Sequence, residues 1–302
     1  MSPPERPDPR TTALTSITLV AFASNSILCR LALAPRLIDA GTFTVVRLVS
    51  GAVMLGIVLI ATERRIALFR VHWFSALALF AYAAPFSFAY LHIPAGTGAL
   101  ILFGAVQVTM IGWDVLHGKL FNIAELLGVV LAVSGLVVLA WPGASAPDIQ
   151  GASLMAVAGV AWGVYSLLGR GVGDPLRATA SNFALSLVFA VPLGVASYNS
   201  ATVTVHGLVL ALCSGAVASG IGYAIWYAAL RGLTSTQAGI VQLLVPVLAA
   251  LGGVFLLGES ISLRLVVSAV MIFSGVTLAI INVRKSDDTS STRSNQSGVT
   301  FR

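Results

Sequence analysis

Ten long apolar stretches constrain this chain of 302 residues more than any other feature of its sequence. About 20 apolar residues in a helix cross a hydrocarbon core of about 30 Å. Each backbone N–H and C=O group in that core needs a partner inside the protein, and only helices and closed barrels supply one. Apolar and polar residues do not alternate in the stretches, as they would in barrel strands, so the pattern predicts an all-α membrane protein with ten transmembrane helices. The expected spans are 12–33, 42–61, 73–91, 96–114, 123–141, 151–170, 177–198, 206–230, 235–257 and 261–282.

Composition and charge agree with a protein whose main partner is the lipid bilayer. Of the residues, 57% are hydrophobic and only 9% are charged, whereas a soluble domain carries about 25% charged residues. The net charge of +6 comes from Lys and Arg in short loops and at the termini, not from a basic helical face. Membrane proteins distribute positive charge in this way, so we expect no nucleic-acid partner.

The sequence carries no signature of a metal site or of an enzyme. Cys29 and Cys213 lie in apolar stretches, without the spacing to His that a zinc site needs. Neither a G-x-S-x-G nor an H-E-x-x-H motif occurs, and residues 112–119 miss the phosphate-binding loop pattern by one glycine position. We therefore expect no metal, no cofactor and no enzymatic activity.

The two halves of the chain align at a constant offset of 140 residues, which predicts an internal repeat. The matched positions are Phe22 with Trp162, Ser26 with Ser166, Arg30 with Arg170, Phe43 with Phe183, Gly118 with Gly258, and Ser134–Gly135 with Ser274–Gly275. Five crossings per unit is an odd number, so the units would enter the membrane from opposite sides. Inverted repeats of this kind occur in secondary transporters, with the substrate near the midplane between the halves.

This division predicts two membrane units with a polar segment at each end of the chain. The expected parts are a disordered N-terminus (1–11), a first five-helix repeat (12–141), an inverted second repeat (151–282) and a disordered cytoplasmic tail (283–302). With the N-terminus inside, the inner loops and termini hold 13 Lys and Arg residues and the outer loops hold 3. That excess predicts that both termini are cytoplasmic.

Several residues make the chain resemble the drug/metabolite transporter superfamily, whose members have tandem EamA units. The resemblance covers about residues 12–282 and is carried by the five-plus-five arrangement together with short motifs. These motifs are Arg47 in the second segment, the Ser-Gly pairs at 134–135 and 274–275, Pro246, and Leu257–Gly258–Glu259. The first half departs from the pattern, with Lys119 at the position of Glu259.

The resemblance implies a central cavity lined by segments 1, 3, 4, 6, 8 and 9, with segments 5 and 10 at the periphery. Within the superfamily, the chain looks most similar to bacterial amino-acid exporters. It is thereby identified as a secondary transporter that exports small metabolites, including aromatic amino acids, across the bacterial inner membrane by alternating access. An exporter of other small molecules or drugs, and a membrane enzyme acting on lipid-linked substrates, are the alternatives.

Polar and aromatic side chains inside the apolar segments indicate where a substrate would bind. Amide and hydroxyl groups are costly against lipid, so they should face a cavity or a neighbouring helix. The expected aromatic surface is Tyr82, Phe86, Trp162, Tyr223 and Trp226, and the expected polar orienters are Asn25, Gln107 and Gln242. Because no charge is expected at the midplane, the pocket should accept uncharged or zwitterionic metabolites. Packing between helices is the alternative role for these residues.

Four further residues are expected to be structural or to act in gating. Arg47 lies about one turn inside the predicted outer end of its segment, and Glu259 is its candidate partner because it lies at the same end. Pro85 and Pro246 interrupt helical hydrogen bonding and would act as static bends or as gates. No carboxylate is expected at the midplane, so facilitated diffusion is the simplest mechanism. The sequence leaves the oligomeric state open, and a monomer is compatible with it.

Overall fold

The computed structural model describes residues 8–63, 72–118, 123–141, 143, 146–170, 172–233 and 235–279. Within these ranges the chain is helical, with one isolated β-bridge between Ile38 and Val203. The helices are α1 (Pro9–Leu33), α2 (Ala40–Glu63), α3 (Trp73–Ala89), α4 (Ala95–Leu116), α5 (Ile123–Ala140), α6 (Ile149–Leu168), α7 (Pro175–Ser197), η1 (Tyr198–Ser200), α8 (Val205–Leu212), η2 (Cys213–Ile221), α9 (Gly222–Leu230), α10 (Ser235–Gln242), α11 (Leu244–Leu257) and a last helix, Leu263–Ala279.

The ten predicted segments are confirmed as helical in the described part of the chain. The eighth is the continuous run of α8, η2 and α9, and the ninth joins α10 to α11. Eight of the ten are long and apolar enough to span a bilayer, while Trp73–Ala89 and Leu263–Ala279 are shorter apolar helices. The predicted tail 283–302 and Lys119 lie outside the described residues.

The first helix begins earlier than the sequence pattern predicted. Of the expected disordered segment 1–11, residues 1–7 are outside the described part, but the helix already starts at Pro9. The Asp8 carboxylate caps this helix by accepting a hydrogen bond of 2.6 Å from the backbone N–H of Thr11, and that bond lowers the pKa of Asp8. Proline at the first helical position is favourable because its missing N–H would have no partner there.

The outer surface of the bundle is apolar, as a lipid-facing surface should be. Phe74, Leu116 and Phe255, for example, are 79%, 83% and 80% exposed. Polar side chains such as Ser87, Ser186 and Ser214 are instead buried between helices. An apolar exterior over long apolar helices, with polar groups kept between the helices, is the arrangement of a multi-pass membrane protein.

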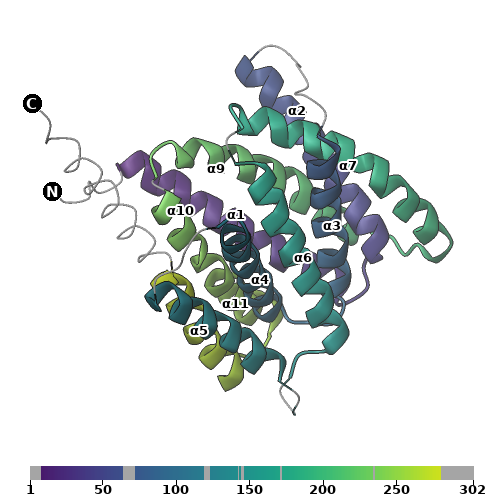
Figure 1. Ribbon diagram of the computed structural model, residues 1–302. Helices are drawn as coiled ribbons and strands as arrows, with labels where there is room; N and C mark the ends of the chain where they lie inside the picture. Colours follow the sequence, from purple (N-terminus) through teal and green to yellow (C-terminus); the bar gives the residue numbers. More distant parts are fainter. Residues whose placement is uncertain are drawn as a thin grey trace, which may run out of the picture.

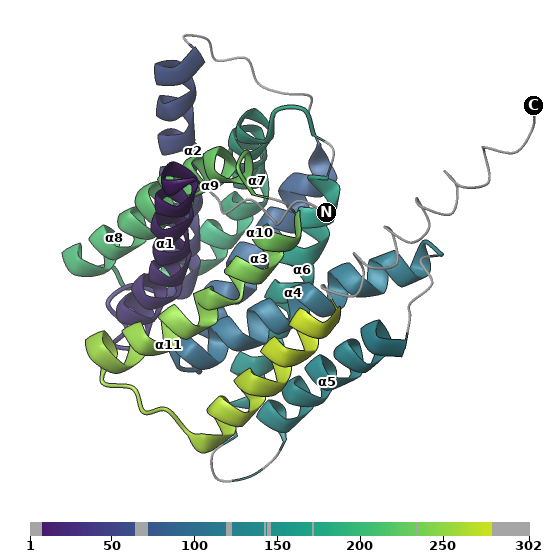
Figure 2. The same ribbon diagram turned by 90° about the vertical axis from the view of Figure 1, so that its left-hand side faces the viewer.

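Helix α5 and the last helix pack against each other at one edge of the bundle, away from its centre (Figures 1 and 2). A Cβ atom on Gly128 would lie 2.6 Å from the carbonyl oxygen of Gly275, and one on Gly135 would lie 2.8 Å from Ile272. The two backbones therefore touch at positions where only glycine fits. This contact explains the glycines of the two Ser-Gly pairs and leaves the other segments to surround the centre.

Two segments depart from a regular α-helix. Residues Cys213–Ile221 form a π-helix, a conformation that is uncommon and often lies at functional sites. The ninth segment breaks at Leu243. Pro246 accounts for this break, because it cannot donate a hydrogen bond to the carbonyl of Gln242 and its ring crowds that carbonyl. Helix α3 continues through Pro85 without a break.

Candidate functional site

A small cavity lies near the centre of the bundle, with walls from both halves of the chain. Its walls are Phe22, Asn25, Ser26, Tyr82, Phe86, Leu102, Phe103, Trp162, Ala218, Ser219, Tyr223 and Gln242. These residues come from segments 1, 3, 4, 6, 8 and 9, the six that the family resemblance implies. The space open to the centres of water-sized spheres is about 40 Å³, which is enough for a few waters. A metabolite would need the walls to move apart.

Aromatic rings form the largest part of the walls, and Trp162 of α6 lies at their centre. Its ring centroid is 4.8 Å from that of Tyr82 and 5.5 Å from that of Tyr223, on which it stacks. Tyr82 in turn lies 5.3 Å from Phe86, and Phe22 lies 5.5 Å from Tyr223. Offset and edge contacts of this kind stabilise a ring cluster by about 0.5–1.5 kcal/mol per pair beyond burial. The same faces would accept a flat apolar group.

A chain of hydrogen bonds runs along one side of the cavity and joins four segments. Ser214 of η2 donates to Oδ1 of Asn25 at 2.5 Å, and Nδ2 of Asn25 donates to the Tyr82 hydroxyl at 3.3 Å. Nη2 of Arg47 donates to the same hydroxyl at 2.7 Å. Polar groups from α1, α2 and η2 therefore converge on Tyr82 of α3, whose ring also contacts Phe86 and Trp162.

Six of the eight predicted binding residues line this cavity. They are Asn25, Tyr82, Phe86, Trp162, Tyr223 and Gln242. Gln107 and Trp226 do not line it. Gln107 shares a helical face with Phe103 but lies one turn, about 5–6 Å, further along α4. Trp226 packs against Phe22 at 6.0 Å in a neighbouring cluster with Ala229 and Ala238. A direct part for Gln107 and Trp226 in binding stays a prediction.

The six wall residues missing from the predicted set had only weak signals in the sequence. They are Phe22, Ser26, Leu102, Phe103, Ala218 and Ser219. Phe22 occupies the repeat position of Trp162, and Ser26 lies one turn after it, so the repeat alignment could have found both. Leu102 and Ala218 look like ordinary apolar residues of a helix, and only packing places them here.

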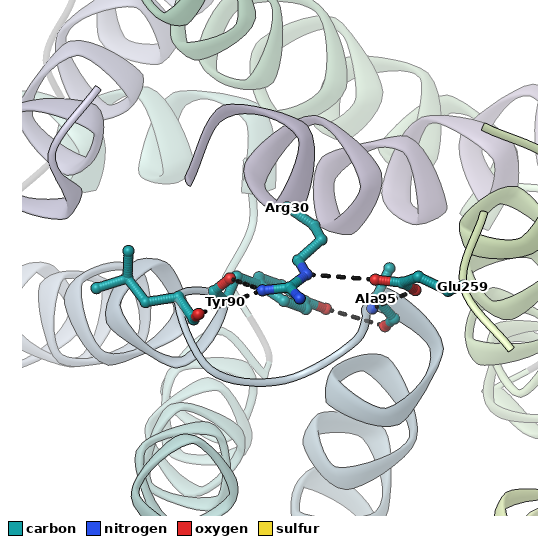
Figure 3. A network of polar contacts seen from close by, with 5 residues as sticks. Arg30, Tyr90, Ala95 and Glu259 are labelled. Carbon is teal, nitrogen blue, oxygen red and sulfur yellow. Dashed lines mark hydrogen bonds and ion pairs between the residues drawn. The ribbon is translucent and has the colours of Figure 1, made fainter. Parts of the chain in front are cut away.

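At one end of the bundle, a polar network joins α1, α11 and the loop between α3 and α4 (Figure 3). Nε of Arg30 pairs with Oε1 of Glu259 at 3.3 Å, and Oε2 of Glu259 accepts from the backbone N–H of Ala95 at 2.9 Å. Nη1 of Arg30 donates to the carbonyls of Tyr90 at 2.7 Å and Leu91 at 3.3 Å. The carboxylate thus caps the N-terminus of α4, where the helix dipole favours negative charge.

Glycine geometry holds the Glu259 carboxylate in this network. Gly258 has a φ of +66° and ends α11, after which the N–H of Glu259 bonds the carbonyl of Gly253 at 3.0 Å. This left-handed turn is a common glycine helix ending, and it folds the chain back over the helix. A Cβ atom on Gly253 would collide with Oε2 of Glu259. The Leu257–Gly258–Glu259 motif therefore positions the Glu259 carboxylate between Arg30 and the first N–H of α4.

The predicted pairing of Arg47 with Glu259 is wrong. Glu259 pairs with Arg30, and the side chain of Arg47 bonds Tyr82. Arg47 does not face lipid, since the residue is 2% exposed. Its guanidinium lies 4.7 Å from the Phe86 ring centroid and 5.1 Å from that of Tyr82. A cation therefore lies directly behind two walls of the cavity.

A second ion pair, Arg170 with Asp114, joins the end of α6 to the end of α4 at 3.1 Å. Its side chains are 48% and 32% exposed, compared with 20% and 14% for Arg30 and Glu259. No group of three or more His, Cys, Asp or Glu residues that could hold a metal occurs within the described residues.

Apolar helices around a small cavity with aromatic walls form the architecture of a small-molecule carrier in a membrane. The sequence model of the EamA-like transporter family matches residues 149–281, the second half of the chain. An uncharacterized protein of Pseudomonas aeruginosa, PA1977, is 51% identical over 274 residues, covering 91% of this chain and 96% of that one. An uncharacterized transporter of Archaeoglobus fulgidus is 29% identical, covering 64% of this chain and 70% of that one. The chain belongs to the EamA-like transporter family.

More distant similarities agree with this assignment. The threonine/homoserine exporter RhtA of Salmonella typhimurium is 31% identical over 143 residues, covering 46% of this chain and 48% of the exporter. A crystal structure with 20% sequence identity has a TM-score of 0.62 and covers 89% of this chain and 97% of that chain; this similarity concerns the fold. The family assignment confirms that the chain is a transporter and not an enzyme.

Proposed function

We propose that this transporter exports amino acids with apolar side chains, aromatic ones included, across the bacterial inner membrane by alternating access. The observation that carries the proposal is the central cavity, in which aromatic walls surround a few polar groups from both halves. Small-molecule sites generally combine apolar walls with a few orienting polar groups. A zwitterionic amino acid with a flat side chain matches this combination.

The two ion pairs support alternating access because they occupy repeat-related positions. Arg30 and Arg170 lie 140 residues apart, at the ends of segments 1 and 6. Arg30 pairs with Glu259 at the end of segment 9, and Arg170 pairs with Asp114 near the end of segment 4. In an inverted repeat these pairs lie at opposite faces of the membrane. Each would close one entrance, and the more buried Arg30–Glu259 pair corresponds to a closed outer entrance.

Helix packing supports the inverted repeat itself. Helix α1 packs on α11 and α9, and α6 packs on their repeat counterparts α4 and α3. The matched glycines Gly118 and Gly258 both follow the ends of their segments and both have positive φ, +82° and +66°. The matched Phe43 and Phe183 are both buried. A two-fold relation between the halves accounts for all of these pairs.

The charge distribution supports an orientation with both termini in the cytoplasm. In that orientation the Arg30–Glu259 network faces outward and the Arg170–Asp114 pair faces inward. Substrate would enter the cavity from the cytoplasm when the Arg170–Asp114 pair opens, as an exporter requires.

Two observations support the proposed substrate class: the cavity walls and the similarity to one named exporter. RhtA is named as an exporter of threonine and homoserine, which makes amino acids the first class to test. The aromatic walls extend this class to aromatic side chains. Export of other small molecules or drugs is the second candidate, since aromatic walls also bind flat apolar cations.

Counterflow in proteoliposomes tests the proposal. Vesicles loaded with one unlabelled compound receive a trace of the same compound in radiolabelled form, across a panel of amino acids, nucleosides and cationic drugs. A carrier for amino acids accumulates the label transiently for amino acids and not for the other classes. Accumulation of drugs alone would reject the proposed substrate class. Efflux of label without counterflow would indicate a channel.

A further inference from the structure

The guanidinium of Arg47 is a buried cation without a carboxylate partner in the described part of the chain. Arg30 and Arg170 each pair with a carboxylate, whereas Arg47, which is 2% exposed, lies over the rings of Phe86 and Tyr82. Rings attract a cation but do not neutralise it. A charge in a membrane interior is costly and usually marks a functional position.

Two of the three nitrogens of this guanidinium have no hydrogen-bond partner among the described residues. Nη2 donates to the Tyr82 hydroxyl at 2.7 Å, but Nε and Nη1 are buried and unpaired. Arginine has five N–H donors in a planar fork that suits a carboxylate. Buried polar groups nearly always find partners, so unpaired ones require an explanation.

The Tyr82 hydroxyl connects this buried cation to the cavity wall through a hydrogen bond. It accepts hydrogen bonds from Nη2 of Arg47 and from Nδ2 of Asn25. Ser214 orients that amide by donating to its Oδ1. With both acceptor sites occupied, the hydroxyl can act further only as a donor, and its proton has no acceptor within the described residues. Tyr82 itself lines the cavity.

We propose that Tyr82 and Arg47 recognise the carboxylate of the transported metabolite, an inference that rests on the proposed amino-acid transport. The Tyr82 hydroxyl donates its proton to a carboxylate oxygen in the cavity. Arg47 does not line the cavity, so it acts as a positioning residue through Tyr82 and compensates the carboxylate's negative charge. The ring or aliphatic part of the substrate then lies against Trp162 and Phe86. Substrates without a carboxylate leave the buried cation uncompensated and are discriminated against.

Competition between a carboxylic acid and its amide tests this inference. In proteoliposomes exchanging radiolabelled phenylalanine, unlabelled phenylalanine should inhibit at least about tenfold more strongly than phenylalanine amide, since a hydrogen bond to a charged group is the one lost. Arg47→Met and Tyr82→Phe should each bring this ratio close to one, while Arg47→Lys should restore part of it. Arg170→Met removes an arginine that does not contact the cavity, and it should leave the ratio unchanged.

The ratio separates recognition from a purely structural role of Arg47. If Arg47 only braced α2 against α3, its loss would weaken the acid and the amide alike and leave the ratio unchanged, which would overturn the inference. If Arg47→Met does not fold, Tyr82→Phe, which keeps the ring, decides in its place. A wild-type ratio near one would also overturn the inference while leaving amino-acid transport intact.

A binding measurement separates failure of this inference from failure of the proposed function. If the wild type exchanges no amino acid, the proposed function fails. Thermal stabilisation of the purified full chain by 3-phenylpropionate, and not by 3-phenylpropionamide, would then still support carboxylate recognition if Tyr82→Phe abolished it. No stabilisation by either compound would overturn the recognition as well.

Discussion

Replacing Glu259 with Gln should loosen the end of the bundle that the structure shows closed. The substitution keeps the side chain's shape and removes its charge. Two contacts are affected: Oε1 with Nε of Arg30 at 3.3 Å, and Oε2 with the N–H of Ala95 at 2.9 Å. Both partners are donors and an amide has one acceptor oxygen, so one contact is lost and the other becomes a neutral hydrogen bond. Arg30 keeps its bonds to the backbone carbonyls of the loop between α3 and α4 (Figure 3). The entrance should therefore become less firmly closed without unfolding of the bundle.

The magnitude follows from the difference between charged and neutral hydrogen bonds. Hydrogen bonds to a charged group contribute about 1.5–3 kcal/mol and neutral ones about 0.5–1.5 kcal/mol, so the lost contact and the weakened one together cost about 2.5–4 kcal/mol before screening. The side chains of Arg30 and Glu259 are 20% and 14% exposed, so solvent screens part of this. A net loss of about 1–2 kcal/mol changes the ratio of open to closed molecules by a factor of about 5–30.

The accessibility of a cysteine in the cavity wall measures this ratio. Ser219→Cys, in a background with Cys29 and Cys213 replaced by Ser, places one thiol in the wall of the cavity. In intact cells, an impermeant thiol reagent should label it at least about fivefold faster when Glu259→Gln is added. Asp114→Asn, the matched change at the other ion pair, should not accelerate labelling from outside.

Two results would refute this reasoning. Unchanged labelling in a folded Glu259→Gln protein would show that the Arg30–Glu259 pair does not hold the entrance closed. Equal acceleration by Asp114→Asn would show a general loosening of the bundle and not a gate. Acceleration only in inverted vesicles would keep the gate and reverse the proposed topology.

Further predictions concern the wall, the helix contacts, the topology and the coupling. Trp162→Ala should slow transport of aromatic amino acids about two- to tenfold more than that of small aliphatic ones; equal loss in counterflow would point to packing. Gly215→Val should collide with α2 and lower the melting temperature, at a cost of about 1–3 kcal/mol; Gly56→Ala, where nothing lies within 4 Å, is the matched control. Ser290→Cys should react with impermeant reagents only in opened cells, and labelling of intact cells would overturn the topology. Transport should not respond to an imposed pH gradient, and accumulation driven by one would contradict facilitated diffusion.

The positions of the helices could be read from the sequence because the bilayer itself selects them. Hydrocarbon thickness sets the length of an apolar run, so all ten spans were located to within a few residues. Interruptions inside a span were harder to predict. The break at Leu243 had a local signal in Pro246. The π-helix of η2 had no such signal, because it forms where Gly215 allows the backbone to touch α2.

The sequence also predicted most of the cavity-lining residues that it singled out, because unusual side chains at helical spacing share a face. The unusual polar and aromatic residues inside apolar runs were found, and six of the eight line the cavity. The partners of the charged residues were not found. Arg47 and Glu259 were paired because both lie toward the same end of their segments, yet the structure places Arg30 beside Glu259 and Tyr82 beside Arg47.

The sequence by itself determined that the chain crosses a membrane, where it crosses, and which side chains lipid would disfavour. These properties depend on local hydrophobicity, and the bilayer acts on each segment separately. Only the tertiary structure decided which helices are neighbours and how each is rotated about its axis. These depend on contacts between distant residues, such as Gly128 against Gly275 or Gly253 beneath Glu259. The unpaired donors of Arg47 belong to this second kind, since a buried group lacks a partner only in relation to everything packed around it.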